Sequence, residues 1–383
     1  MKALLVDPSL YTGPYDAALD VGLAAAGVST TWATRPPRAG ERFEVVRSEP
    51  FFYRCSDQAR LPARLRAIAK GCAHVAGMWR LLRMIRRERP DVVHFQWLVI
   101  PLIDMAVMAL IRRRCAVILT VHDTVAYNGA KVAWLQRMGI DHAARLAHRV
   151  IVHTRAGCER LRAQGVPRER IAVIPHGPLR LSMPPVAPQA KDGRWTLVLF
   201  GEIKPYKGLD VLIEAVAALD PGLRRELRVI VAGRPRMDIA PCAQRIAALR
   251  ADAQFELRLR RLDEEEMARL FAAADAFVFP YRHIDASGVF HLVRGLGKWL
   301  IATRVGVFAE EMRPGEGALV PPGDVAALSR ALAHALRERP RGSTHGGGAS
   351  WESIGAATRT LYEGARAELA ARALPPRTRL AGP

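Results

Sequence analysis

Cysteine is scarce in this 383-residue chain, and its few occurrences are scattered. None of the five cysteines belongs to a C-x-x-C pair, and their number is odd: they are Cys55, Cys72, Cys115, Cys158 and Cys242. Disulfide frameworks and zinc sites need paired or clustered cysteines. The sequence therefore argues against both and fits a reducing cytoplasm.

Long hydrophobic runs are also missing. The longest apolar stretch, 97–111, contains Asp104 and is too short for a transmembrane helix. Met1 and Lys2 lead directly into the apolar residues 3–6, so we expect no signal peptide. These absences predict a soluble, cytoplasmic protein.

Acidic residues are outnumbered, with 37 Asp and Glu against 57 Lys and Arg and a formal net charge of +20. Such an excess favours an anionic partner, which can be a nucleic acid, an acidic membrane surface or a phosphorylated substrate. Aromatic residues make up only 7% of the chain, and no nucleic-acid-binding motif is recognisable. We therefore expect no nucleic acid partner.

The chain does have a regular alternation of short apolar runs and helical patterns. Strands are predicted at 3–6, 29–33, 43–46, 91–95, 116–121, 149–152 and 171–174, and again at 195–200, 228–232, 255–259, 276–280 and 300–303. The alternation predicts an α/β fold with two Rossmann-like doubly wound domains that face each other across a cleft. A G-x-G-x-x-G fingerprint is absent from the sequence.

Proline content marks the domain boundary. The segment 179–194 is the predicted linker between an N-terminal domain, 1–178, and a C-terminal domain, 195–350. The remaining segment, 351–383, is expected to begin with a helix at 351–371 that packs back on the N-terminal domain. We expect it to end in a disordered tail rich in Pro and Arg.

A basic turn follows the first predicted strand of the second half. Gly201 ends the apolar run, Lys204 and Lys207 follow, and a helical pattern begins after Gly208. A strand, a glycine-containing basic turn and a helix together place N–H groups and ammonium charges beside a phosphate. The alternative is an ordinary βα connection with solvated lysines, and spacing alone favours neither.

Four histidines fall at the carboxyl ends of predicted strands in the first half: His94, His122, His153 and His176. Ligands of open α/β sheets bind at this edge. One histidine there is usually structural, but four on one edge indicate a binding site.

Arginine and lysine cover one face of a long helical region at 61–89, and apolar residues recur along it at helical spacing. A packed helix pair with a solvated basic face is the favoured interpretation. The alternative is a surface that binds anionic lipid.

Eight stretches occur in an order that resembles one known family: DVVHFQW, TVHDT, IVHTRAGCERL, VIPHG, FGEIKPYKGLDVLIEA, AGRP, DAFVFPYRHIDASGVFHLVRGLGKWLIATRVG and SWESIGAATRTLYEGAR. Over nearly the whole chain they resemble the GT-B glycosyltransferases, particularly the bacterial family-4 enzymes. The resemblance implies a hexosyltransferase that moves a sugar from a nucleotide diphosphate sugar to a glycan, glycolipid or polyprenyl-linked acceptor in exopolysaccharide or lipopolysaccharide synthesis.

The same resemblance implies an acceptor-binding N-terminal domain and a nucleotide-sugar-binding C-terminal domain. It further implies retention of the anomeric configuration. The nucleotide region contains no D-x-D, and lysines are expected to meet the diphosphate charge, so we expect no metal requirement and no cofactor. Acceptors of this family are often membrane-located, so the basic N-terminal half is expected at the inner face of the cytoplasmic membrane, against anionic lipid.

Roles for individual residues follow from the resemblance. Lys204 and Lys207 would neutralise the donor diphosphate and act mainly in the transition state, as charge builds on the leaving phosphate. The donor phosphate would lie against Gly201, Lys204, Lys207, Ser287, Gly288 and Val289. For Ser287 and Gly288, a simple helix N-cap is the alternative.

His122 would touch the donor sugar near the reacting carbon. The expected catalytic set is His122, Lys204, Lys207 and Asp285, and the cleft between donor and acceptor would be lined by Gly13, Tyr15, His94, Asp123 and His153.

The sequence departs from the family where two glutamates are expected. Ile284 and Leu292 stand at those positions, and Asp285 is the adjacent candidate substitute. If the reaction inverts the anomeric centre, Asp123 or Asp16 is the candidate base. The missing carboxylates leave open an alternative, a degenerate protein that binds a nucleotide sugar or a partner without catalysis.

Overall fold

The N-terminal sheet consists of parallel strands in the order β3-β2-β1-β4-β5-β6-β7. The computed structural model describes residues 1–383 except 39–40, 55–61, 125–139, 182–192, 344–347 and 374–383. The strands are β1 (Lys2–Asp7), β2 (Ser29–Thr34), β3 (Ser48–Pro50), β4 (Val92–Phe95), β5 (Ala116–Val121), β6 (Arg149–Val152) and β7 (Ile171–Val173). The helices are α1 (Gly13–Ala25), α2 (Ala63–Glu88), α3 (Pro101–Ile111), α5 (Ile140–Leu146) and α6 (Arg155–Ala163), with a 3-10 turn, η2 (Arg168–Arg170).

The C-terminal sheet is also parallel, in the order β10-β9-β8-β11-β12-β13. Its strands are β8 (Trp195–Phe200), β9 (Leu227–Ala232), β10 (Phe255–Arg258), β11 (Ala276–Phe279), β12 (Trp299–Thr303) and β13 (Gly317–Val320). Its helices are α7 (Leu209–Ala217), α8 (Pro221–Arg225), α9 (Ala240–Ala248), α10 (Glu264–Ala273), α11 (Gly288–Val293), α12 (Gly306–Glu311) and α13 (Val325–Glu338), with 3-10 turns η3 (Pro205–Lys207) and η4 (Arg294–Leu296).

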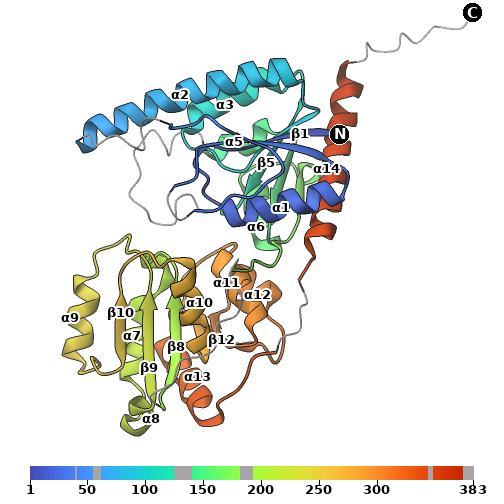
Figure 1. Ribbon diagram of the computed structural model, residues 1–383. Coiled ribbons are helices and arrows are strands. Elements are labelled where there is room, and N and C mark those ends of the chain that lie inside the picture. Colours follow the sequence, from blue (N-terminus) through green and yellow to red (C-terminus); the bar gives the residue numbers. More distant parts are fainter. Residues whose placement is uncertain (39–40, 55–61, 125–139, 182–192, 344–347, 374–383) are drawn as a thin grey trace, which may run out of the picture.

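Strand order reverses once in each sheet, between β1 and β4 and between β8 and β11. Doubly wound sheets bind ligands at such reversals, beyond the carboxyl ends of the strands. The two Rossmann-like domains expected from the sequence are confirmed, and they lie one above the other in Figure 1.

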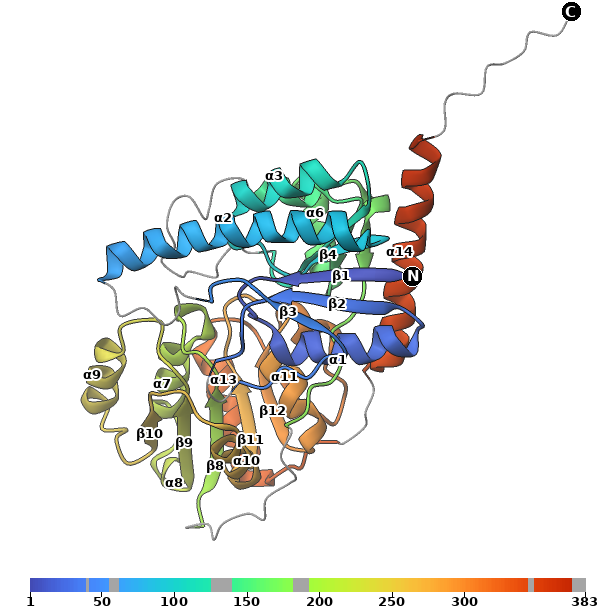
Figure 2. The same cartoon turned by 45° about the horizontal axis from the view of Figure 1, so that its top comes forward.

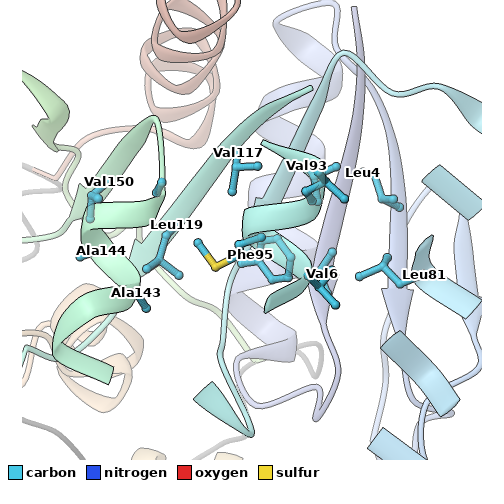
Figure 3. Packing of buried hydrophobic residues seen from close by; sticks show 14 of the residues in the cluster. Leu4, Val6, Leu81, Val93, Phe95, Val117, Leu119, Ala143, Ala144 and Val150 are labelled. Carbon is cyan, nitrogen blue, oxygen red and sulfur yellow. The ribbon is translucent and has the colours of Figure 1, made fainter. Parts of the chain in front are cut away.

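Continuous apolar runs form the central strands because helices cover both faces of each sheet. On one face of the N-terminal sheet, Val6, Phe95 and Leu119 pack against α2, α3 and α5. Figure 3 shows Leu81 of α2 and Ala143 of α5 beside these side chains. On the other face, Leu5 and Ile118 pack against α1 and the last helix, α14 (Trp351–Ala373). Figure 2 shows α2 and α3 on the opposite side of the sheet from α1.

Helix α14 returns to the N-terminal domain and crosses α1 at two glycines (Figure 1). A Cβ on Gly22 would lie 2.1 Å from the Trp351 carbonyl oxygen, and a Cβ on Gly355 would lie 1.9 Å from the carbonyl oxygen of Gly22. Only glycine permits this backbone approach. Farther along the helix, the Tyr362 hydroxyl lies 2.7 Å from Nδ1 of His94 in β4.

Two expectations for the N-terminal half are wrong. Residues 43–46 are not a strand, because the Val46 N–H donates to the Asp20 side chain (2.9 Å) and pairing with β2 begins only at Ser48. The region 61–89 is not a helix pair, because 63–88 form the single helix α2. Gly77, rather than breaking the helix, makes room for the Phe52 ring, which lies 2.3 Å from where its Cβ would be.

Two further differences concern smaller segments. The edge strand β13 was not predicted, and the last helix extends two residues beyond 371. The expected linker 179–194 and the tail after 373 lie largely outside the described residues. Within the described part of the chain, no helix has the length and apolar character needed to cross a membrane.

Candidate functional site

The basic turn after β8 is shaped by two glycines in the left-handed region. Gly201 has φ +100° and Gly208 has φ +68°. A Cβ on Gly208 would lie 2.0 Å from the Pro280 carbonyl oxygen, so the start of α7 packs directly on the end of β11. Between the glycines, η3 positions Lys207 beneath the turn.

Lys207 is buried, with 5% of its surface exposed. Its Nζ donates to the Phe200 carbonyl at 3.2 Å and lies 5.3 Å from the centre of the Tyr281 ring. Burial, together with the charge of Lys204, lowers the pKa of Lys207 to about 7. The interpretation of a solvated lysine is therefore wrong for Lys207.

Lys204 lies nearer the surface of the same turn. Its Nζ is 3.2 Å from Oε2 of Glu202, and Arg236 contacts the other oxygen of Glu202 at 2.6 Å. Burial raises the pKa of Glu202, but hydrogen bonding and charge from Arg236 and Lys204 outweigh it and hold the pKa below its usual value. The turn therefore carries two cations, Lys204, which is paired with Glu202, and Lys207, which is buried.

The first turn of α11 faces the glycine turn. A Cβ on Gly201 would lie 3.0 Å from Cγ2 of Val289 and 2.9 Å from Nζ of Lys207. Ser287 caps this helix, because its Oγ accepts the Phe290 N–H at 3.3 Å. The structure thus brings Gly201, Lys207 and Val289 together, with Ser287 in the capping role.

On the N-terminal side, Tyr15 lies at the centre of a ring of histidines. Its ring centre is 4.9 Å from that of His122, 5.4 Å from His153 and 4.8 Å from His176. All three histidines are buried, and burial lowers the pKa of His153 to about 4 and that of His176 to about 3. The three histidines are therefore neutral at neutral pH.

The hydrogen bonds of this ring fix one tautomer of His122. Nδ1 of His153 lies 3.0 Å from the Ile174 carbonyl, which can only accept, so it carries the proton. The other nitrogen of neutral His153 then accepts from Nδ1 of His122, at 3.0 Å. His122 therefore presents a lone pair on Nε2.

Gln96, buried below His122, was not anticipated from the sequence. Nε2 of His122 lies 3.2 Å from Oε1 of Gln96. The amide nitrogen of Gln96 has no hydrogen-bond partner among the described residues. Two acceptors do not bond each other, so the amide takes the opposite orientation and its NH₂ donates to His122. The position after a strand was its only sequence signal.

His94 and Asp123 have different surroundings. His94 is fully buried and bonds Tyr362 and Thr120, both at 2.7 Å, so it lies within the domain rather than on its surface. Asp123 follows His122 at the end of β5, and its charge acts on Tyr206 of η3, where it adds to burial in raising the pKa of that phenol. Asp123, next to His122, therefore interacts across the domains with Tyr206, next to Lys207.

Gly13 and Asp16 lie in the first turn of α1. Gly13 packs on Leu10, whose Cγ would be 3.6 Å from a Cβ there. Asp16 is fully buried, and burial and its neighbour Asp7 raise its pKa well above the usual value. Because Asp7 already accepts the Tyr11 N–H at 2.6 Å, the proton shared by the carboxyl pair belongs to Asp16, which does not suit a general base.

Asp285 lies in a contact between the domains. Its carboxylate accepts the Thr124 N–H at 2.5 Å and forms an ion pair with Arg160, and 3% of the residue is exposed. Ile284 and Leu292, which replace the expected glutamates, pack in the apolar core beside α11.

Two more interdomain contacts were not anticipated. Glu310 accepts the backbone N–H groups of Arg155 and Ala156, at 2.8 and 2.9 Å, and so caps α6 from the other domain. His176 stacks on His291 with ring centres 4.2 Å apart and an angle of 3°. No local sequence pattern marks either contact, because each partner belongs to a different domain.

Two family models match the chain in succession. Residues 13–177 match a glycosyl transferase 4-like domain, and residues 194–338 match the glycosyl transferases group 1. The chain is 32% identical over 185 residues to a D-inositol 3-phosphate glycosyltransferase of Actinosynnema mirum, covering 44% of each. It is 31% identical over 154 residues to a GDP-mannose:glycolipid 4-beta-D-mannosyltransferase of Xanthomonas campestris, covering 38% of this chain and 42% of that one. The chain thus matches less than half the length of these relatives.

Solved structures resemble the chain over its whole length. HepE of Anabaena, solved with UDP and glucose, gives a TM-score of 0.65 at 16% identity and covers 97% of this chain and 99% of its own. A sucrose-phosphate synthase of Thermosynechococcus elongatus gives 0.65 at 18% identity, with 97% of each chain covered. At such identities the likeness supports the GT-B arrangement of the two domains.

Proposed function

Because the chain belongs to the glycosyltransferases, with a 4-like N-terminal domain and a group 1 C-terminal domain, we propose that it transfers a hexose from a nucleotide diphosphate sugar to a glycan, glycolipid or polyprenyl-linked acceptor. We further propose that it serves exopolysaccharide or lipopolysaccharide assembly and retains the anomeric configuration. The observation that carries the transfer proposal is the buried ammonium of Lys207 beneath Gly201, facing the first turn of α11.

The donor diphosphate would lie between the glycine turn and α11. Departure of the nucleotide places negative charge on the phosphate, and a buried cation stabilises that charge more strongly than a solvated one. Among the described residues, Lys207 forms no ion pair with a carboxylate, and its Nζ donates to the Phe200 carbonyl, so its charge is available to the phosphate. Its pKa of about 7 would rise on binding, and the neutral amine form of Lys207 would take up a proton with the donor.

His122 would accept a hydrogen bond from a hydroxyl of the donor sugar through its Nε2 lone pair. The relay through His153 to the Ile174 carbonyl holds that lone pair in place. Gln96 competes for the same atom, so the sugar hydroxyl would displace or share the Gln96 amide. No metal or cofactor is needed in this proposal.

The exposed face of α2 would dock on an anionic membrane. Leu65, Ile68, Val75 and Trp79 are each more than half exposed and lie on one stripe of the helix, at intervals of three, seven and four residues. Arg83 lies over the Trp79 ring at 4.6 Å. An apolar stripe flanked by arginines suits a lipid surface at the inner face of the cytoplasmic membrane.

Thermal unfolding of the full chain with UDP-, GDP-, ADP- and dTDP-sugars tests donor binding, because a ligand of the native state raises its melting temperature. We expect one nucleotide class to stand out. Lys207→Ala should lose both that shift and transfer, whereas Lys2→Ala, which removes an exposed lysine of β1, should lose neither. Full transfer by Lys207→Ala would overturn the assignment of the phosphate site.

A degenerate sugar-nucleotide-binding protein is the second candidate. It is favoured by the apolar packing of Ile284 and Leu292 and by the commitment of Asp285 to Thr124 and Arg160. Calorimetric binding of a donor, with no nucleotide released in the presence of any acceptor, would select this candidate. Co-sedimentation with anionic liposomes at low salt tests the membrane proposal separately.

A further inference from the structure

An exposed tyrosine and a half-buried tryptophan lie beside His122 and have no role in the site described so far. Tyr11 is 66% exposed, although it is a large ring in the loop between β1 and α1. Its ring centre lies 5.2 Å from that of Trp97, at 42°, and Trp97 stacks on His122 at 5.0 Å and 14°. The three rings therefore form a continuous series from solvent to the buried histidine.

The loop holds Tyr11 rigidly in this exposed position. The preceding residue, Leu10, has φ +47°, a conformation that residues with a Cβ rarely adopt. The buried carboxylate of Asp7 holds the turn by accepting the N–H groups of Ser9, Tyr11 and Thr12, at 3.1, 2.6 and 3.3 Å. An exposed ring held by a strained, fully bonded turn is preorganised for a ligand rather than left over from packing.

Trp97 is held as firmly on the other side. Its Nε1 donates to the Thr12 hydroxyl at 3.0 Å, so its one polar group is satisfied and its ring is left for apolar contact. The local segments 8–15, 96–100 and 122–124 contain no lysine or arginine. Arg35, which donates to the Ser9 carbonyl, is buried and paired with Glu41 at 2.8 Å.

From this geometry we propose that Tyr11 and Trp97 form the subsite for the acceptor, and that the acceptor presents a neutral pyranose ring there. The proposal rests on the proposed function, which puts the donor diphosphate at Lys207 and the donor sugar at His122, so that Tyr11 lies on the acceptor side. One face of a pyranose carries C–H groups, and these pack on the electron-rich face of an aromatic ring. A phosphorylated cyclitol would instead require cations, which these segments lack, and Arg160, which donates to Thr124, is already paired with Asp285.

The test uses the full chain with UDP-glucose and GDP-mannose as donors. The acceptors are octyl β-glucoside, octyl β-galactoside and octyl α-mannoside, below their micellar concentrations, with myo-inositol 1-phosphate as the charged competitor. Release of nucleoside diphosphate is measured. We expect transfer to a glycoside, and in Tyr11→Ala an increase of about tenfold in the KM for the acceptor with an unchanged KM for the donor.

Two variants control the comparison. Tyr11→Phe keeps the ring and should keep the acceptor KM, and Val21→Ala shortens an exposed side chain on α1 and should change nothing. An unchanged acceptor KM in Tyr11→Ala, or preferred transfer to myo-inositol 1-phosphate, overturns the subsite.

A second measurement decides the proposal even where no transfer occurs. In saturation-transfer NMR, irradiation of the aromatic protons of the protein should reach the C–H protons of a bound octyl glycoside, and Tyr11→Ala should lose this transfer. If the wild type releases no nucleotide with any donor, the proposed function fails and this arm alone judges the subsite. Equal saturation transfer in wild type and Tyr11→Ala then overturns it.

Discussion

The two domains contribute different kinds of group to the site, a cation on one side and neutral rings on the other. The C-terminal side offers a buried cation, Lys207, which forms no ion pair with a carboxylate in the part of the chain that the structure describes. The N-terminal side offers neutral histidines and aromatic rings around Tyr15, joined by hydrogen bonds that end on a backbone carbonyl. Charge suits a diphosphate, and neutral hydrogen-bond acceptors and rings suit a sugar. In our proposal, the two ends of the donor are therefore matched by different chemistry on different domains.

The largest expected effect comes from removing the charge on the C-terminal side. Lys207→Met keeps the length of the side chain but should lower transfer about 10²- to 10³-fold, because the charge that develops on the phosphate loses its buried partner. Steady-state release of nucleoside diphosphate measures this effect. A loss of less than about tenfold would mean that Lys204 carries the phosphate by itself.

The same variant should be more stable than the wild type. Since the folded pKa of about 7 lies below that of an unfolded lysine, the unfolded chain binds more protons between pH 7 and pH 10, and wild-type stability rises over that range. Urea unfolding should show a wild-type gain on the order of 3 kcal/mol between pH 7 and pH 9.5 that Lys207→Met lacks. Lys2→Met, an exposed control, should keep the wild-type slope.

Sequence patterns predicted the parts of the site that depend on neighbouring residues. The basic turn was recognisable because a strand, two glycines and two lysines follow one another within Phe200–Gly208. His94 and His122 both followed apolar runs and looked alike. Their surroundings differ because the partner of His94 is Tyr362, 268 residues away, on a helix whose return no local pattern specifies.

The role of Asp285 was equally hidden. Its position beside the missing glutamates indicated the donor, but its partners Thr124 and Arg160 belong to the other domain. Such contacts depend on how two domains dock, which periodicity within either domain does not encode. The same reason explains why Glu310 and His291 were not anticipated.

The N-terminal side can be disrupted through His153, which does not itself reach the sugar in our proposal. His153→Phe removes the acceptor for Nδ1–H of His122, so His122 is no longer held in one tautomer. We expect kcat to fall about 10- to 100-fold with little change in the donor KM. ¹⁵N chemical shifts of His122 should show mixed tautomers.

His153→Gln is the matched control, because a glutamine amide can donate to the Ile174 carbonyl and accept from His122 at once. It should recover most of the activity and the single tautomer. Equal losses in the Phe and Gln variants would indicate a packing role for His153 instead of a positioning one.

Variants of Asp285 and Arg160 can distinguish an interdomain role of Asp285 from a catalytic role. If Asp285 only joins the domains, Asp285→Asn and Arg160→Met should each lower transfer about tenfold. The double variant should be little worse than either single variant, because the effects of removing the two partners of one contact are not additive. If Asp285 substitutes for a family glutamate at the donor, Asp285→Asn should lose far more than Arg160→Met. Initial rates of the four proteins at saturating donor decide between these roles.

The smallest effect should be a pH dependence of domain contact at the His176–His291 stack. Burial lowers the pKa of both rings, and separation of the domains would expose them, so the separated form binds more protons as pH falls from 7 to 5 and is favoured there. Glu311, 4.0 Å from His291, has its pKa raised to about 7 by burial and opposes this trend. Arg294 also faces His291, and its charge disfavours protonation of that ring while the domains are in contact.

The net dependence should therefore be a weakening of donor affinity by only a few-fold between pH 7 and pH 5. His291→Phe keeps an aromatic ring on His176 but removes one titrating group, which leaves one histidine against one glutamate and should flatten the profile. Glu311→Gln removes the opposing group and should steepen it. Donor titrations by calorimetry at the two pH values measure all three proteins, and the same slope in each would show that the stack does not govern how the domains meet.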